Sequence, residues 1–169
     1  MINLRKKFKN FGLLELLVFV SVFYAVSMLI WTATTRNAVL EKANSIKSNH
    51  TSVVKLLNNE VNKCSQDLQK LTSWGENCNS TWTSPAIVGY ILKNIKLKNP
   101  YSISKPLIQS SSDPRIDAEG KAGQSTNKGV IFVSLNDFNA EAGSEWIVGT
   151  CVKSPCVAAG NNELVSIYR

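Results

Sequence analysis

An almost unbroken run of apolar residues lies near the N-terminus of the chain. It extends from Phe11 to Trp31 and contains one charge, Glu15, and no proline. At about 1.5 Å per residue, a helix of this length spans about 30 Å, the thickness of the hydrocarbon core of a bilayer. We therefore predict a helix over residues 11–31 that lies in a membrane or in an equally apolar protein environment.

After residue 31 the pattern changes from wholly apolar to one-sided. Apolar residues recur at every third or fourth position, which is the period of one face of an α-helix. These positions are Val39, Ala43, Ile46, His50, Val53, Leu57, Val61, Cys64, Leu68 and Leu71. No glycine or proline interrupts the stretch. We predict one helix, Phe11–Leu71, about 90 Å long, in which residues 32–72 are amphipathic and need a globular partner.

Residues 73–169 have the features of that globular partner, or head. A Gly/Asn/Ser-rich loop is followed by a short helix, with Thr83 or Ser84 as its cap and Pro85 in its first turn. A polar stretch up to Lys128, predicted to lack regular structure, follows. Three strand-like runs separated by turn-forming residues then predict an antiparallel meander: Gly129–Leu135, Glu145–Val152 and Glu163–Tyr168. The fold class is α+β, with the long N-terminal helix packed on an antiparallel sheet of about three to four strands.

The distribution of charge gives the orientation and excludes one class of partner. Residues 1–10 contain four basic residues and no acidic one, so the positive-inside rule leaves this basic leader in the cytoplasm. The remaining chain has 15 basic and 12 acidic residues, a net +3 out of the total +7. This mild balance does not by itself indicate a nucleic-acid binder. A cleaved secretory signal is disfavoured, because the apolar run is too long and no small-x-small site follows it.

All four cysteines follow the apolar run. An even number of cysteines in an exported domain favours disulfides. Local pairing, Cys64–Cys78 and Cys151–Cys156, is our first expectation, although four cysteines allow three connectivities. A zinc site is the competing interpretation, but the C-x4-C spacing is not typical of one.

Residues 9–18, KNFGLLELLV, resemble the prepilin signature of type IV pilins, K-G-F-T-L-I-E-L-L-V. The residues that carry the resemblance are Phe11, Leu13, Glu15, Leu16, Leu17 and Val18, and Leu14 replaces an isoleucine. The order of leader, apolar helix, amphipathic helix, loop, sheet and C-terminal cysteines is also similar to that family. The resemblance implies that a prepilin peptidase cuts between Asn10 and Phe11 and methylates Phe11. It also implies that the apolar helices of identical or homologous subunits bundle in a filament core.

The residue before the cut departs from the family signature. The family has glycine before the cut, where this chain has Asn10; a cut after Gly12 would instead leave Glu15 two residues too early.

An ionised carboxylate in the hydrocarbon region costs about 2.5–3.5 kcal/mol, so Glu15 needs a partner. The resemblance implies that this partner is the α-amino group of Phe11 on a neighbouring subunit. The alternative is that Glu15 reaches the headgroup region.

The head offers few candidates for chemistry. A lysine cluster at the end of the short helix is either an anion or DNA patch or an ordinary solvated surface; it comprises Lys93, Lys96, Lys98 and Lys105. His50 lies on the apolar stripe and is expected to be packed, because a catalytic or metal role needs convergent partners. We find no catalytic constellation and expect no enzyme activity, no cofactor and no metal.

These observations predict a structural subunit of a type IV pilus. The subunit would wait in the bacterial inner membrane, meet the prepilin peptidase and the pilus assembly platform, and end in an extracellular filament. One alternative is a pseudopilin of a type II secretion or competence system, whose filament stays in the periplasm. An alternative of another class is a periplasmic binding protein with a permanent single-pass anchor.

Overall fold

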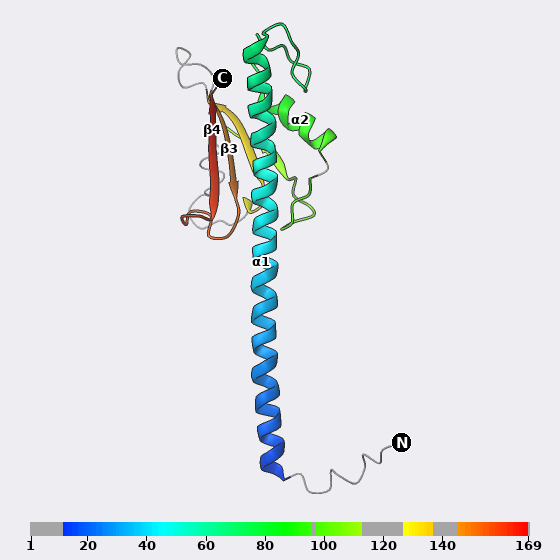
Figure 1. Cartoon of the computed structure of the whole chain (residues 1–169), viewed down its shortest axis with the longest axis vertical. Helices are drawn as coiled ribbons and strands as arrows, with labels where there is room; N and C mark the ends of the chain where they lie inside the picture. The colour runs from blue at the N-terminus through cyan, green and yellow to red at the C-terminus, as the bar shows by residue number, and fades with distance from the viewer. Residues whose placement is uncertain (1–11, 96, 113–126, 137–144, 169) are drawn as a thin grey trace, which may run out of the picture. The chain divides into compact units, whose positions relative to one another are not determined.

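The computed structural model describes residues 12–95, 97–112, 127–136 and 145–168. It has a long N-terminal helix, a short helix and a four-stranded sheet, which confirms the α+β class. The chain divides into two compact units, residues 1–41 and residues 42–169. Helix α1, Leu13–Gln66, begins in the first unit and ends in the second (Figure 1).

The described part of the first unit is the N-terminal part of α1. Every residue from Leu13 to Glu41 is helical and exposed within the single chain. The helix is long and apolar enough to cross a membrane. The apolar side chains of the first unit are therefore not buried by any other described residue of the chain.

In the second unit, α1 carries the stripe that its sequence period predicts. The buried positions at helical spacing are Ala43, Ile46, His50, Val53, Leu57, Val61 and Cys64. The stripe is shorter than predicted at both ends, because Val39, Leu68 and Leu71 are exposed. The helix also ends at Gln66 instead of Leu71, since the carboxylate of Asp67 accepts a hydrogen bond from the Gln69 N–H (3.0 Å) and forms a local turn.

The three predicted strands form the expected antiparallel meander. They are β2 (Ile131–Asn136), β3 (Glu145–Cys151) and β4 (Asn162–Tyr168). β3 pairs with both neighbours, and Val148 lies opposite Val133 on one side and Val165 on the other. Since side chains alternate along a strand, these residues share one face of the sheet.

The prediction of a purely antiparallel sheet is wrong in one strand. β1 (Ile108–Ser110) lies in the stretch predicted to lack structure, and it pairs with β2 in parallel, with Ile108 opposite Ile131. The sheet is therefore mixed, in the order β1-β2-β3-β4. Leu107 and Ile108 are buried, and this short apolar pair anchors a strand that is too short to give a periodic signal.

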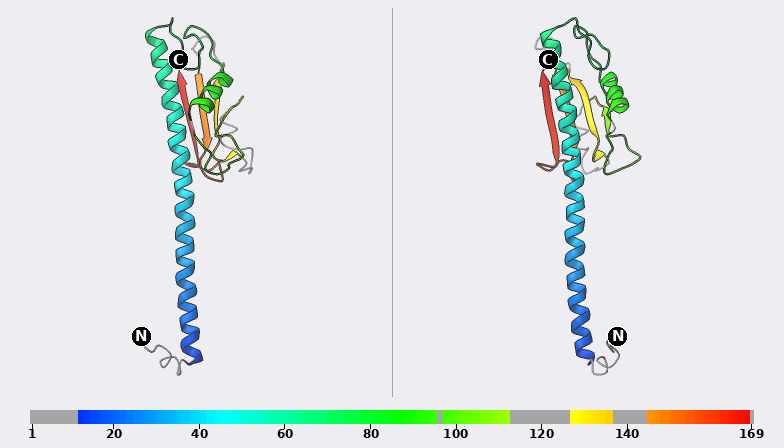
Figure 2. Two further views of the ribbon diagram at one scale, coloured as in Figure 1. Left: turned by 90° about the vertical axis from the view of Figure 1, so that its right-hand side faces the viewer. Right: turned by 45° about the vertical axis from the view of Figure 1, so that its right-hand side comes forward.

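Both helices contribute to one hydrophobic core against a single face of the sheet (Figure 2). The core joins the α1 stripe to Trp146 and Val148 of β3 and to Ile87 and Ile91 of α2 (Ser84–Asn94). α2 begins after Thr83 with Pro85 in its first turn, as predicted. Its outer face is left free to line the surface described below.

Candidate functional site

The signature residues lie at the start of α1, in the first unit. Leu13, Leu14, Leu16, Leu17 and Val18 are all exposed. Asn10 and Phe11, the predicted cleavage and methylation residues, lie outside the described residues, as do residues 1–9.

The serine and threonine hydroxyls in the apolar part of α1 are bonded within the helix. The Ser21 and Ser27 hydroxyls donate to the carbonyls of residues 18 and 23, at 2.8 and 2.7 Å. The hydroxyls of Thr32, Thr34 and Thr35 donate in the same way to carbonyls three or four residues earlier. A hydroxyl that is bonded to its own helix does not need water, so these residues remain compatible with an apolar surrounding.

Glu15 is the only charged residue between Leu13 and Thr35. One of its carboxylate oxygens accepts a hydrogen bond from the N–H of Gly12 at 3.2 Å. Gly12 directly precedes the helix, and its own carbonyl accepts the N–H groups of Glu15 and Leu16. This is half of a capping box, with the acidic group at the positive end of the helix. Within one chain, Glu15 therefore caps α1 as well as carrying a charge.

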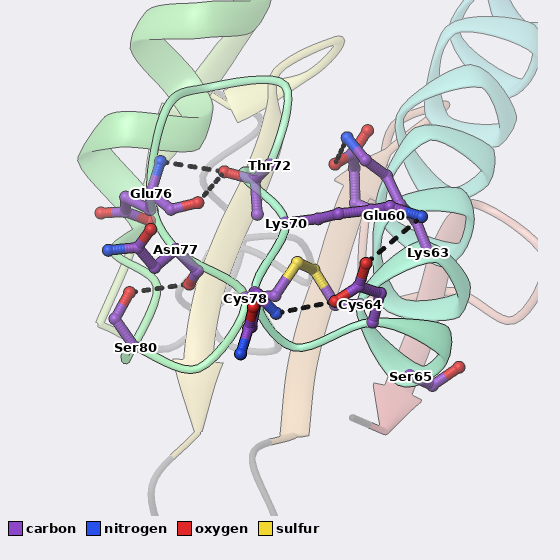
Figure 3. The surroundings of a disulfide bond; sticks show 12 residues. Glu60, Lys63, Cys64, Ser65, Lys70, Thr72, Glu76, Asn77, Cys78 and Ser80 are labelled. Atoms are coloured by element: carbon purple, nitrogen blue, oxygen red, sulfur yellow. Dashed lines mark hydrogen bonds and ion pairs between the residues drawn. A yellow bond between two sulfur atoms is a disulfide. The ribbon is translucent and has the colours of Figure 1, made fainter.

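Two disulfides close short loops of the head. Cys64 in the last turn of α1 is bonded to Cys78, and Cys151 at the end of β3 is bonded to Cys156. These are the local pairs that the sequence favours. Figure 3 shows the first disulfide beneath the loop that follows α1, where the Cys78 N–H also donates to the Lys70 carbonyl at 2.9 Å. The loop is thus fixed at both of its ends.

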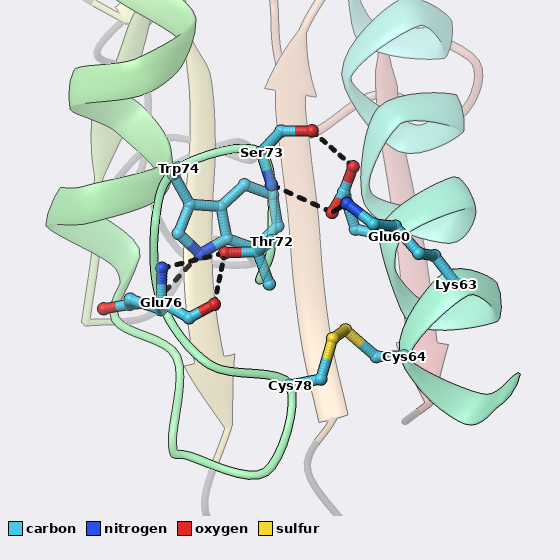
Figure 4. Close-up of polar contacts among 8 residues, drawn as sticks. All are labelled: Glu60, Lys63, Cys64, Thr72, Ser73, Trp74, Glu76 and Cys78. Atoms are coloured by element: carbon cyan, nitrogen blue, oxygen red, sulfur yellow. Dashed lines mark hydrogen bonds and ion pairs between the residues drawn. A yellow bond between two sulfur atoms is a disulfide. The ribbon is translucent and has the colours of Figure 1, made fainter. Parts of the chain in front are cut away.

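A buried carboxylate on α1 holds the middle of this loop. Glu60 lies on the helix face next to the core and is only 7% exposed. Its carboxylate accepts the N–H and the hydroxyl of Ser73, at 3.0 and 2.5 Å, and lies 3.4 Å from the ammonium group of Lys63 (Figure 4). A largely desolvated carboxylate with three such donors is well satisfied and positions the loop backbone at Ser73.

A second carboxylate, that of Glu76, ties the loop to α2. One oxygen accepts the indole N–H of Trp74 at 2.9 Å and the N–H of Thr83 at 3.1 Å. The other oxygen accepts the hydroxyl of Thr83 at 2.9 Å. Thr83 is the N-cap residue of α2. One side chain therefore fixes Trp74 in relation to the start of the helix beside it.

Between the loop and α2 the surface is hollowed. The hollow, which we call the Trp74 pocket, has a volume of about 510 Å³ and is bordered by Ser73, Trp74, Gly89, Tyr90, Lys93 and Asn94. This volume is within the range of about 300–1,000 Å³ typical of ligand sites. Trp74 also packs edge-on against the buried Trp82, with ring centroids 5.0 Å apart, which holds its own ring in place.

The described lysines of the predicted cluster border two hollows. Lys93 borders the Trp74 pocket, whereas Lys98 and Lys105 border a different hollow of about 420 Å³ with Leu92 and Ile103. Lys96 lies outside the described residues. The described lysines of the cluster therefore do not all border one hollow.

His50 is packed between α1 and the sheet. It is buried, and its Nε2 lies 3.2 Å from the carbonyl oxygen of Val148 in β3, to which it donates when protonated at that nitrogen. Burial lowers the pKa of the imidazole below its ordinary value, although this hydrogen bond and the charge of Glu163 act in the opposite direction. Among the residues that the structure describes, no group of three His, Cys, Asp or Glu side chains could hold a metal.

Sequence reasoning missed the two glutamates and the pocket. Glu60 is next to the apolar stripe, and only its position one before Val61 hinted that its side chain turns inward. Glu76 lies in a polar loop, where an acidic residue gives no distinguishing signal.

Comparisons with protein-family models, with curated proteins and with solved structures find no match to this chain.

Proposed function

We propose that the chain is a structural subunit of a type IV pilus, assembled through the apolar helix after removal of its basic leader. The observation that carries this proposal is the surface of α1 in the first unit. From Leu16 to Thr35 it has no charge, it is exposed on all sides within one chain, and its serine and threonine hydroxyls are bonded internally. Such a surface needs an apolar surrounding, which a bilayer supplies before assembly and a bundle of like helices supplies afterwards.

A single anchor in a membrane would explain the apolar surface equally well, so the proposal also depends on the signature of residues 9–18. That signature places a cut between Asn10 and Phe11 and puts the new amino group four residues before Glu15. A permanent anchor has no use for this arrangement. The head, with its core and two disulfides, supplies the folded outer part that an exported subunit needs.

The proposal is tested by determining where the mature protein begins and where it is found. Intact-mass analysis of the chain from the membrane of its native host, and from material sheared from the cell surface, should give a protein that begins at Phe11 and carries one additional methyl group. The sheared material should contain filaments of this protein. Retention of Met1 in filament-incorporated protein would contradict the cleavage, and absence from sheared filaments would favour a pseudopilin or a permanent anchor.

A further inference from the structure

The Trp74 pocket lies outside the apolar stretch of α1 on which the filament proposal depends. One of its walls is the loop at residues 73–75, and the other is the face of α2 formed by Ala86, Gly89, Tyr90 and Lys93. Gly89 and Tyr90 both lie three or four residues from Ala86 and from Lys93, so the four positions lie on one side of the helix. The pocket therefore combines two segments that the core and Glu76 hold in fixed relation.

Gly89 is the feature that the fold does not explain. Glycine within a helix costs about 0.5–1 kcal/mol relative to alanine, and it is retained where something must approach closely. A Cβ atom built at Gly89 would meet no other atom within 4 Å. No described neighbour therefore requires the glycine, but its missing side chain deepens the hollow between Trp74 and Tyr90.

The polar groups of the pocket indicate the chemistry of its ligand. Among the described residues the Lys93 ammonium group and the Tyr90 hydroxyl have no hydrogen-bond or ion-pair partner. Asn94 uses its amide N–H₂ on the Tyr90 carbonyl at 2.9 Å, which leaves its side-chain oxygen as an acceptor. The pocket thus offers one cation, one hydroxyl and one amide oxygen beside aromatic surface.

The aromatic side chains limit the shape of the ligand. The rings of Trp74 and Tyr90 are 6.4 Å apart at an angle of 63°, so they form a corner and do not form two parallel plates. A flat nucleobase is best held between parallel rings or on one free ring face, whereas a puckered ring with apolar C–H faces fits a corner. The indole N–H is already bonded to Glu76, so Trp74 offers mainly apolar surface.

The charge of the pocket favours a carboxylate over a phosphate. Lys93 is in the last turn of α2, where the helix dipole presents its negative end. Phosphate sites often use arginine forks or several cations, whereas the residues bordering this pocket include no arginine and one basic side chain, Lys93. One lysine at such a position suits a single carboxylate.

We propose that the Trp74 pocket binds an acidic saccharide, whose sugar ring packs in the Trp74–Tyr90 corner beside Gly89 and whose carboxylate pairs with Lys93. The Tyr90 hydroxyl and the Asn94 side-chain oxygen bond the sugar hydroxyl groups. Glu60 and Glu76 hold the loop wall in place before binding, so little ordering is needed when the ligand arrives. This binding activity is independent of the filament proposal.

The test is a titration of the full chain in nanodiscs with digalacturonate and with its uncharged methyl ester, followed by ligand-observed NMR. We expect saturable binding of digalacturonate, with about tenfold weaker binding of the ester, because a charge-assisted hydrogen bond contributes about 1.5 kcal/mol or more. Lys93→Gln should weaken digalacturonate binding by a similar factor. The matched control is Lys55→Gln, an exposed lysine on α1 that does not border the pocket, and it should leave affinity unchanged.

Gly89→Leu provides a variant that fills the pocket without disturbing the fold. The new side chain points into open space and leucine is a better helix former, so the unfolding temperature should be unchanged or higher. Binding should be lost. Absence of saturable binding to the wild-type chain, equal affinity for acid and ester, or retained binding in Gly89→Leu would each overturn the proposal. Tighter, Lys93-dependent binding of a single-stranded oligonucleotide would overturn it in favour of a phosphate site.

Discussion

Replacing Glu15 separates its role as a helix cap from the role that we propose for it in filament assembly. Within one chain its carboxylate caps α1 by accepting the Gly12 N–H at 3.2 Å. A glutamine can accept the same bond, since Glu and Gln both occur at this position of capping boxes. In the proposed filament Glu15 also pairs with the amino group of Phe11 on a neighbouring subunit, for which it must be charged. Glu15→Gln therefore retains the cap and removes the charge, whereas Glu15→Ala removes both.

The two roles differ strongly in magnitude. One capping bond contributes about 1 kcal/mol, a small loss for a helix of 54 residues. Removing the charge eases membrane insertion by about 2.5–3.5 kcal/mol. In a dry helical bundle, however, it leaves the Phe11 amine unpaired, which costs about 3–5 kcal/mol. The association constant for an incoming subunit should fall by more than about a hundredfold for both variants.

The assay compares filament yield at equal amounts of membrane protein. Both variants are expressed in the native host, their membrane levels are matched by immunoblot, and sheared surface filaments are quantified. We expect both to insert normally and both to assemble poorly. Leu17→Ala is the control, because it removes apolar contacts of an exposed position and no charge, and it should lower the yield much less.

Recovery of normal filaments by Glu15→Gln but not by Glu15→Ala would refute the charge-pairing argument. Capping would then account for the importance of the residue. Normal yield from both variants would mean that filament assembly does not need the carboxylate, and the filament proposal would lose the support that it takes from Glu15.

Three further predictions concern the stability of the head, measured by urea unfolding of the full chain in detergent. Burial lowers the pKa of His50 in the folded state, so the unfolded chain binds the proton more readily. The free energy of unfolding should therefore not depend on this group well above its ordinary pKa of 6.5, and it should fall as the pH drops below that value. His50→Gln should flatten the profile between about pH 8 and about pH 5, and an equal slope in both proteins would contradict this. Glu60→Ala should cost about 2–3 kcal/mol through the lost bonds to Ser73, and a cost under about 0.5 kcal/mol would mean that water replaces them fully. Gly129→Ala should cost about 2–4 kcal/mol, because its φ is 80° and a Cβ atom would collide with a neighbouring Asn side chain. Gly75→Ala is its control, because φ is also positive there but a Cβ atom would meet no other atom within 4 Å. An equal loss of stability in both variants would show that only the backbone conformation matters.

The sequence alone determined the elements that have a local period. The stripe from Ala43 to Cys64 is buried as predicted, because a helix places every third or fourth residue on one face whatever it later packs against. The short helix was predictable from Thr83 and Pro85, and the three long strands from their apolar runs. These signals depend only on neighbouring residues, so they can be recognised without the fold.

Only the tertiary structure decided the features that depend on distant partners. β1 is three residues long and forms because it pairs with β2, with Ile108 opposite Ile131. No local sequence pattern encodes this pairing. Leu68 and Leu71 continue the helical period, yet they are exposed because the chain turns at Asp67. Tertiary contacts overrode the sequence pattern at these positions.

The candidate sites divide in the same way. The apolar helix and Glu15 are visible in the sequence because a long uncharged run and one isolated charge are local properties. The Trp74 pocket is not, since its walls come from a loop and a helix that Glu76 joins across seven residues. A carboxylate in a polar loop has many possible partners, and only folding selects the Trp74 indole and the first residues of α2.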